Sequence, residues 1–98
     1  MILVRDVFQL KFGKAKNAKA LWKKGNAINR KLGYGPGRGM VDLVGTYYTF
    51  VLETTYKDLA DYERALKKVL GVREWSSWYR QFMPLVESGH REIYTVLE

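Results

Sequence analysis

A strand pattern followed directly by a helix pattern occupies Leu3–Leu32, LVRDVFQLKFGKAKNAKALWKKGNAINRKL. Apolar and polar residues alternate over Leu3–Phe12, which is typical of a half-buried strand. From Ala15 to Leu32 the apolar residues recur every three to four positions, as on one face of a helix. The side of the strand expected to pack under helices carries the row Phe8, Leu10 and Phe12.

The rest of the chain continues this order of segments. Two further alternating stretches, Met40–Val44 and Tyr47–Glu53, are separated by Gly45 and Thr46, which predict a tight hairpin turn. A second helical stretch covers Leu59–Val86, and a last strand is expected over Glu92–Leu97. The order is β-α-β-β-α-β, which predicts an α+β fold with an antiparallel four-stranded sheet and both helices on one face. Residues 1–98 form a single domain of this kind.

Local signals refine the helical stretches and the glycine-rich segment. Asp58, with Asp61 three residues later, resembles a helix N-cap, and Gly71 is expected to break or bend the second stretch. The segment Gly33–Gly39 must be a loop, and its Arg38 raises the question of anion binding. Phosphate-binding glycine motifs follow a strand and open a helix, whereas this one follows a helix. A lid or a plain connector is therefore expected.

Composition and charge limit the classes of protein. The chain has 98 residues, no cysteine and a net charge of +7. Residues 1–41 hold ten Lys and Arg against one acid, a net of +9, and residues 42–98 hold seven against nine, a net of −2. No apolar run is long enough for a membrane span, and the first residues lack the basic region of a signal peptide. We expect a globular protein of the reducing cytoplasm that does not enter membranes.

Two segments of the second half resemble a known family. They are Tyr56–Glu63 and, above all, Glu74–Tyr94, with its W-x-x-W-Y…P-L-V-x-x-G-x-R-E-I-Y run. They resemble the NIPSNAP-like members of the dimeric α/β barrel superfamily, and the order of elements agrees over nearly the whole chain. The superfamily includes small monooxygenases, haem-binding and haem-degrading proteins, isomerases and many members of unknown role.

The resemblance implies a ferredoxin-like protomer that forms a homodimer. Two sheets would meet across their helix-free faces to close a barrel, and a pocket would lie between each sheet and its own helices. The mixed row Arg5, Val7, Gln9 and Lys11 on the other side of the first strand suits such an interface. NIPSNAP-like proteins have no agreed catalytic motif, so the resemblance assigns no catalytic residue.

Aromatic residues are the candidates for lining the pocket. Trp22, Trp75 and Trp78 lie on the two helical stretches, and Asn26 of the first helix would add a polar group. Phe8 and Phe50 would contribute from the sheet. The alternative interpretation is that these aromatic side chains are core filler, with each indole N–H bound to a structural partner.

Candidate catalytic side chains are few. His90 is the only histidine and suits a general base or an axial haem ligand, although it also fits an ordinary turn beside Gly89. Tyr48 would bring a phenol to the sheet as a donor to a developing oxyanion. Asp42, like Asp6, would be a candidate base if it faced the helices, but both residues lie near the ends of the predicted strands, where exposure is the simpler expectation. Haem-handling relatives carry their histidine on a helix, and neither helical stretch has one.

The sequence therefore favours a protein that binds or converts a small hydrophobic molecule in a sheet–helix pocket, in the manner of a cofactor-independent monooxygenase or isomerase. A non-catalytic homodimeric binding module is the alternative. We expect no cofactor. We also expect no metal, because the chain has one histidine, no cysteine and no paired acids at ligand spacing. An RNA-recognition domain shares the order of elements, but Thr46, Tyr47 and Thr49 do not fit its third-strand motif. Nucleic acid is thus not expected as a partner.

Overall fold

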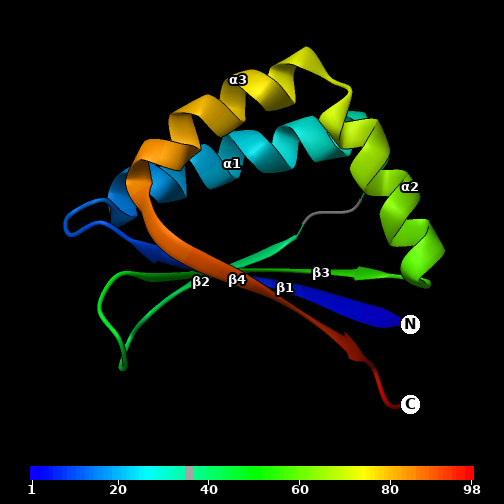
Figure 1. Ribbon diagram of the computed structural model, residues 1–98, viewed down its shortest axis with the longest axis horizontal. Coiled ribbons are helices and arrows are strands. Elements are labelled where there is room, and N and C mark those ends of the chain that lie inside the picture. The colour runs from blue at the N-terminus through cyan, green and yellow to red at the C-terminus, as the bar shows by residue number, and fades with distance from the viewer. Residues whose placement is uncertain (35–36) are drawn as a thin grey trace.

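One antiparallel sheet covered by helices on a single side makes up the protein (Figure 1). The computed structural model describes residues 1–34 and 37–98. The sheet has the strand order β2-β3-β1-β4. Its strands are β1 (Ile2–Leu10), β2 (Arg38–Val41), β3 (Thr49–Tyr56) and β4 (Val86–Thr95). The helices are α1 (Ala15–Lys31), α2 (Leu59–Leu70) and α3 (Arg73–Phe82), and a short 3-10 turn, η1 (Met83–Leu85), leads into β4.

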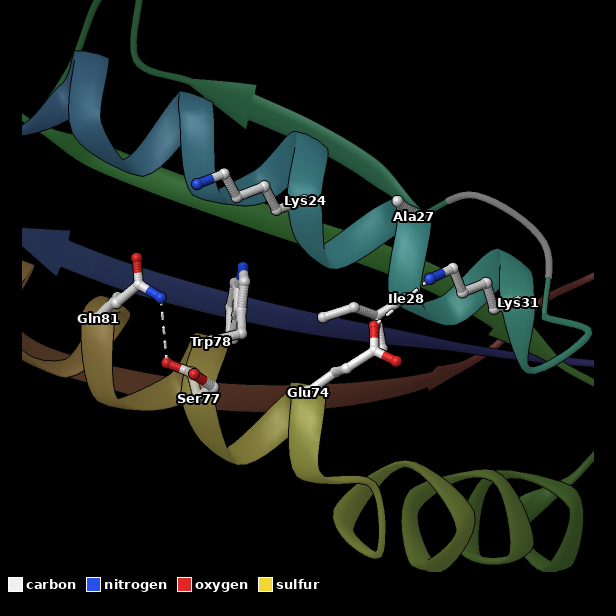
Figure 2. Close-up of a pocket in the computed structure, with 8 residues that line it drawn as sticks. All are labelled: Lys24, Ala27, Ile28, Lys31, Glu74, Ser77, Trp78 and Gln81. Carbon is white, nitrogen blue, oxygen red and sulfur yellow. Dashed lines mark hydrogen bonds and ion pairs between the residues drawn. The ribbon is translucent and has the colours of Figure 1, made fainter.

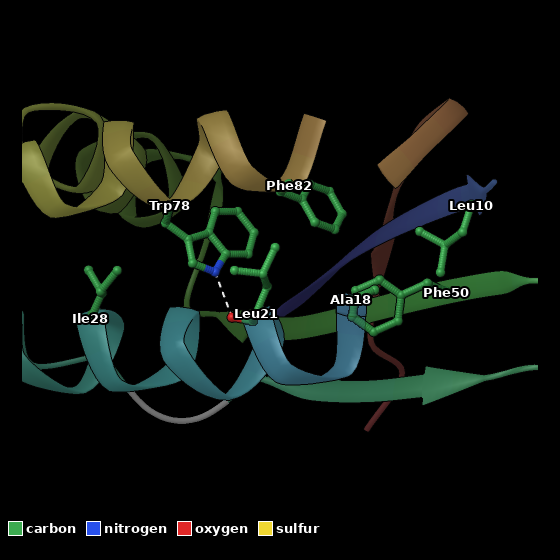
Figure 3. Packing of buried hydrophobic residues seen from close by; sticks show 7 residues of the cluster. All are labelled: Leu10, Ala18, Leu21, Ile28, Phe50, Trp78 and Phe82. Carbon is green, nitrogen blue, oxygen red and sulfur yellow. Dashed lines mark hydrogen bonds between the residues drawn. The ribbon is translucent and has the colours of Figure 1, made fainter. Parts of the chain in front are cut away.

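The hydrophobic core lies between the sheet and the pair α1 and α3. Figure 3 shows its buried members, which come from both layers: Leu10, Ala18, Leu21, Ile28, Phe50, Trp78 and Phe82. The predicted helical stripe of α1 is confirmed, because Ala18, Leu21, Gly25 and Ile28 are its buried residues. Apolar burial of this kind is the main term that holds the helix layer on the sheet.

Close packing of α1 and α3 depends on a glycine. A side-chain carbon added at Gly25 would lie 3.2 Å from the Trp78 indole, so the glycine allows the ring to approach the α1 backbone. The indole Nε1–H donates a hydrogen bond of 2.6 Å to the carbonyl oxygen of Leu21. The Trp78 side chain therefore joins the two helices by packing and by a buried polar contact.

The connection between β2 and β3 is wider than predicted. The prediction of a tight turn at Gly45 and Thr46 is wrong. Strand β2 ends at Val41, which pairs with Phe50, and residues 42–48 form the loop. The Asp42 carboxylate accepts from the Thr49 backbone N–H at 3.0 Å, which closes the wider loop. Tyr48 has a positive φ of 59°, so the strand alternation cannot continue through it.

Strand ends differ from the predictions at two further places. Phe12 does not pack under the helices, because β1 ends at Leu10 and the Phe12 side chain is 75% exposed. Gly89 is not in a turn but lies within β4, which begins at Val86, and it pairs with Phe8. A side-chain carbon at Gly89 would be 2.9 Å from the Phe8 ring, so glycine is needed for this close approach rather than for a turn. The break at Gly71 is confirmed, because α2 ends at Leu70.

Capping at the start of α2 yields a first testable prediction. The Asp58 carboxylate accepts from the Asp61 backbone N–H at 2.8 Å, and the Asp61 carboxylate accepts from the Lys57 backbone N–H at 3.0 Å. We expect Asp58→Ala to lower the free energy of unfolding by about 1 kcal/mol, because it leaves a helix N-terminal donor without its partner. Urea unfolding measures the change. Glu63→Ala, which removes an exposed acid of the same helix, should change it by no more than about 0.5 kcal/mol; equal losses would contradict the cap.

The other face of the sheet carries no helix among the described residues, and strand alternation places Arg5, Val7 and His90 on it. In the two described stretches, 1–34 and 37–98, no helix has the length and apolarity needed to cross a membrane.

Candidate functional site

The main chamber is a cavity of about 450 Å³ between α3 and the β1–β4 side of the sheet. Its walls are largely aromatic, with side chains from β1 and α3: Phe8, Trp75, Trp78, Tyr79 and Phe82. The Trp75 and Trp78 rings stack with centroids 4.7 Å apart, and Phe8 meets Phe82 edge-on at 5.0 Å. Flat walls of this kind offer a ring-shaped apolar molecule both burial and stacking.

The polar end of the main chamber is an ion pair. Asp6 on β1 and Arg91 on β4 face each other in the strand register, and the Arg91 Nε–H donates to the Asp6 carboxylate at 2.6 Å. Asp6 lies within β1 and faces the helices, so the expectation that it sits near a strand end and is exposed is wrong; its side chain is 23% exposed. Burial lowers the pKa of Arg91, but the hydrogen bond and charge of Asp6 more than offset this, and the pKa is raised overall.

Two tyrosines from neighbouring elements extend this polar end. The Arg91 guanidinium lies 5.8 Å from the centre of the Tyr62 ring, and the Tyr62 and Tyr56 rings are 5.1 Å apart. Burial raises the pKa of Tyr62, against the opposing influence of Arg91, and burial also raises the pKa of Tyr56. Both phenols therefore stay protonated at neutral pH and remain hydrogen-bond donors.

Two smaller cavities adjoin the main chamber. The α2 cavity, of about 140 Å³, contains Tyr56 and Tyr62 and shares Asp6 and Arg91 with the main chamber. The α1 cavity, of about 70 Å³, lies beside Trp22, Asn26 and Asn29. All three spaces share Leu52 and Trp75. The Trp75 indole is thus a common wall, and its orientation sets how far the three spaces join.

The α1 cavity contains an unpartnered donor. The Trp22 indole N–H is buried and has no hydrogen-bond partner among the described residues. A side-chain carbon at Gly39 would lie 2.6 Å from the same ring, so the indole packs directly on the β2 backbone. An ordered water or a ligand oxygen in this cavity would satisfy such a donor.

A separate groove lies on the outer side of the helix layer (Figure 2). It has a volume of about 320 Å³ and runs between Lys24 and Lys31 of α1 and Ser77 and Gln81 of α3. Lys31 pairs with Glu74 at 3.6 Å, and both side chains are mostly exposed. This groove faces solvent and has neither the aromatic walls nor the Asp6–Arg91 ion pair of the main chamber.

The structure brings together most of the predicted pocket residues. Phe8, Trp75 and Trp78 line the main chamber, and Trp22 and Asn26 line the α1 cavity. Phe50 is 2% exposed and lies in the core, against Phe8 and Phe82. The role of these residues in binding stays a prediction.

The three predicted catalytic candidates lie apart from one another. Asp42 caps the β2–β3 loop, and Tyr48 precedes β3 and packs on Phe12, with ring centroids 5.0 Å apart. His90 lies inside β4 rather than in a turn; its imidazole pairs with Glu92 at 3.3 Å, and alternation with Arg91 directs it to the helix-free face. His90 is also one of the β4 residues that line the main chamber.

Arg91 and Tyr62 were not singled out from the sequence. The signal for Arg91 was the antiparallel pairing of the first and last strands, which places it opposite Asp6. Within residues 1–34 and 37–98 no group of three His, Cys, Asp or Glu side chains is positioned to hold a metal ion.

The sheet, the helix layer and the cavity between them define a ferredoxin-like α+β protein with a sheet–helix pocket. The NIPSNAP family model matches residues 5–98, and the chain belongs to the NIPSNAP family.

Solved structures agree with this assignment. A NIPSNAP family protein from Agrobacterium tumefaciens is 20% identical, with a TM-score of 0.88 over 99% of this chain and 93% of that one. An uncharacterized NIPSNAP-like domain protein from Burkholderia xenovorans is 23% identical, with a TM-score of 0.86 over 98% and 84%. An antibiotic biosynthesis monooxygenase is 13% identical, with a TM-score of 0.77 over all of both chains. At these identities the likeness concerns the fold. No functionally curated protein matches the chain in sequence.

Proposed function

We propose that the protein binds a small, hydrophobic, ring-containing molecule in the main chamber. The observation that carries this proposal is the combination of a cavity of about 450 Å³, walls of five aromatic side chains and a single ion pair at one end. Small-molecule sites are usually clefts of roughly 300–1,000 Å³ with apolar walls and a few polar groups that fix orientation. The chamber has this composition, whereas the outer groove between α1 and α3 does not.

Conversion of the bound molecule, by cofactor-independent oxygenation or by isomerisation, is the most specific form of the proposal. Arg91 is a hydrogen-bond donor at the polar end, and the protonated phenol of Tyr62 lies beside it in the adjoining α2 cavity. A donor aimed at a developing oxyanion stabilises it. The fold shared with an antibiotic biosynthesis monooxygenase is consistent with this form but does not carry it.

The absence of cysteine leads us to place the protein in the reducing cytoplasm.

Binding of a defined probe tests the proposal. We expect 2-acetylnaphthalene to bind with a Kd below about 1 mM in isothermal titration calorimetry, which is modest for a ligand of this size. Trp75→Ala should weaken binding by about tenfold or more, because the lost indole is a wall of all three cavities. Leu70→Ala, at an exposed position of α2, should leave the Kd unchanged. Equal affinity of the wild type and Trp75→Ala would contradict binding in this chamber.

We also propose that the protein is a homodimer formed through the helix-free sheet face. Val7 and Val51 lie opposite each other in the register and give this face an apolar centre. Around it the charges compensate within one copy: Arg5 pairs with Glu53 at 3.1 Å and with Glu92 at 4.0 Å, and Arg38 pairs with Glu53 at 3.9 Å. Two such faces can meet without net like-charge repulsion, and their mixed character suits an interface. A non-catalytic homodimeric binding module is the alternative function that this face favours.

A further inference from the structure

The charges at the polar end of the main chamber are balanced. Asp6 and Arg91 are the oppositely charged side chains among the residues that line the chamber, and they neutralise each other through a 2.6 Å hydrogen bond. The same pair borders the α2 cavity. Nε of Arg91 is committed to Asp6, so the terminal guanidinium nitrogens are the donors left for Tyr62 and for an occupant of the chamber.

The free donors at this end are the terminal N–H groups of the Arg91 guanidinium. The phenols of Tyr56 and Tyr62, in the adjoining α2 cavity, have raised pKa values and add no charge at neutral pH. An oxygen that accepts hydrogen bonds therefore fits beside Arg91. A carboxylate oxygen would also meet the negative charge of Asp6, and like charges a few ångströms apart repel strongly in a partly buried site. A neutral carbonyl oxygen accepts the same hydrogen bonds without that repulsion.

We infer that the chamber selects ring-conjugated ketones over carboxylates, and that Asp6 sets this preference by neutralising Arg91. The inference rests on the proposed binding function and names its ligand class. Asp6 acts here as a positioning residue: it fixes the guanidinium through Nε and cancels its charge, while Arg91 makes the contact with the ligand oxygen. A molecule with a flat apolar ring system against Trp75 and a ketone oxygen near Arg91 is the predicted ligand.

Three naphthalene probes that differ only in the substituent test the inference. They are naphthalene, 2-acetylnaphthalene and 2-naphthoate, each titrated at neutral pH by calorimetry. The wild type is expected to bind 2-acetylnaphthalene about tenfold more tightly than 2-naphthoate, and more tightly than naphthalene, which lacks the oxygen. A preference for 2-naphthoate, or equal binding of naphthalene and 2-acetylnaphthalene, would overturn the inference while leaving the binding function intact.

Substitution of Asp6 then tests its role. Asp6→Asn keeps an oxygen acceptor for Arg91 Nε but removes the compensating charge, so we expect the ratio of the two affinities to fall to about one or to reverse. Glu92→Gln makes the same charge change on the same sheet but on the helix-free face, and it should leave the ratio unchanged. An unchanged ratio in Asp6→Asn, or an equal change in Glu92→Gln, contradicts the assignment.

Folding and binding failures are separable. Circular dichroism and thermal unfolding show whether Asp6→Asn is folded; if it is not, the wild-type ranking of the three probes still decides for or against the ketone preference. If the wild type binds none of the three probes, the proposed function fails, and the inference fails with it.

Discussion

Trp78→Ala is expected to lower the free energy of unfolding by about 3–5 kcal/mol, which is a large share of the stability of a domain this size. The Trp78 side chain is 6% exposed, so its removal leaves a cavity between the two layers rather than an accessible surface. The ring stacks on Phe82 with centroids 5.0 Å apart and lies against Gly25 of α1. Its loss also removes the hydrogen bond to the Leu21 carbonyl, which joins α3 to α1.

Two variants separate the contributions within this prediction. Trp78→Phe keeps an aromatic ring but removes the indole N–H. We expect it to lower the free energy of unfolding, but by less than Trp78→Ala does. Trp75→Ala is the matched control, because it removes the same type of side chain from the same helix at a half-buried position. It should cost less stability than Trp78→Ala but more ligand affinity. Equal unfolding midpoints and slopes in urea for Trp78→Ala and Trp75→Ala would contradict this division of roles.

The arrangement of the fold was predictable because its signals are local and periodic. The alternation in β1 and the stripe in α1 each follow from the spacing of apolar residues, and the helix break at Gly71 follows from composition. The β2–β3 loop was not predictable in this way. Its shape depends on the left-handed backbone of Tyr48 and on the Asp42 carboxylate bound to the Thr49 N–H, and neither has a periodic signature.

The start of strand β4 was predicted wrongly for a related reason: the strand begins at Val86 and not at Glu92. Gly89 interrupts the apolar pattern, which locally favours a turn, but its place is set by the Phe8 ring on the neighbouring strand. Contacts between residues far apart in sequence are invisible to local patterns. The same limit explains the site: aromatic residues such as Trp75 and Trp78 could be assigned to a pocket, whereas the ion pair of Asp6 with Arg91 needed the pairing of β1 with β4.

Val51→Arg is expected to convert the proposed homodimer into a monomer. Val51 pairs with Val7 in the middle of the helix-free face. In the proposed dimer the new guanidinium would be buried between the two sheets, and the acid Glu53 of this face is already paired with Arg5. An added buried charge without a partner costs several times the thermal energy, so association should weaken by at least about a hundredfold. Size-exclusion chromatography with light scattering measures the result, as a mass that falls from about twice 11.4 kDa to 11.4 kDa.

The control for this prediction places the same charge on the opposite side of the molecule. Leu70→Arg changes a residue of α2 that is 56% exposed, and it should leave the mass of the dimer unchanged. A wild-type mass of 11.4 kDa would refute the dimer directly, and a dimeric Val51→Arg would show that the copies meet elsewhere. Because the main chamber lies on the helix side of the sheet, a folded Val51→Arg monomer should still bind 2-acetylnaphthalene. Assembly and ligand binding are thus expected to be separable functions of the two faces of one sheet.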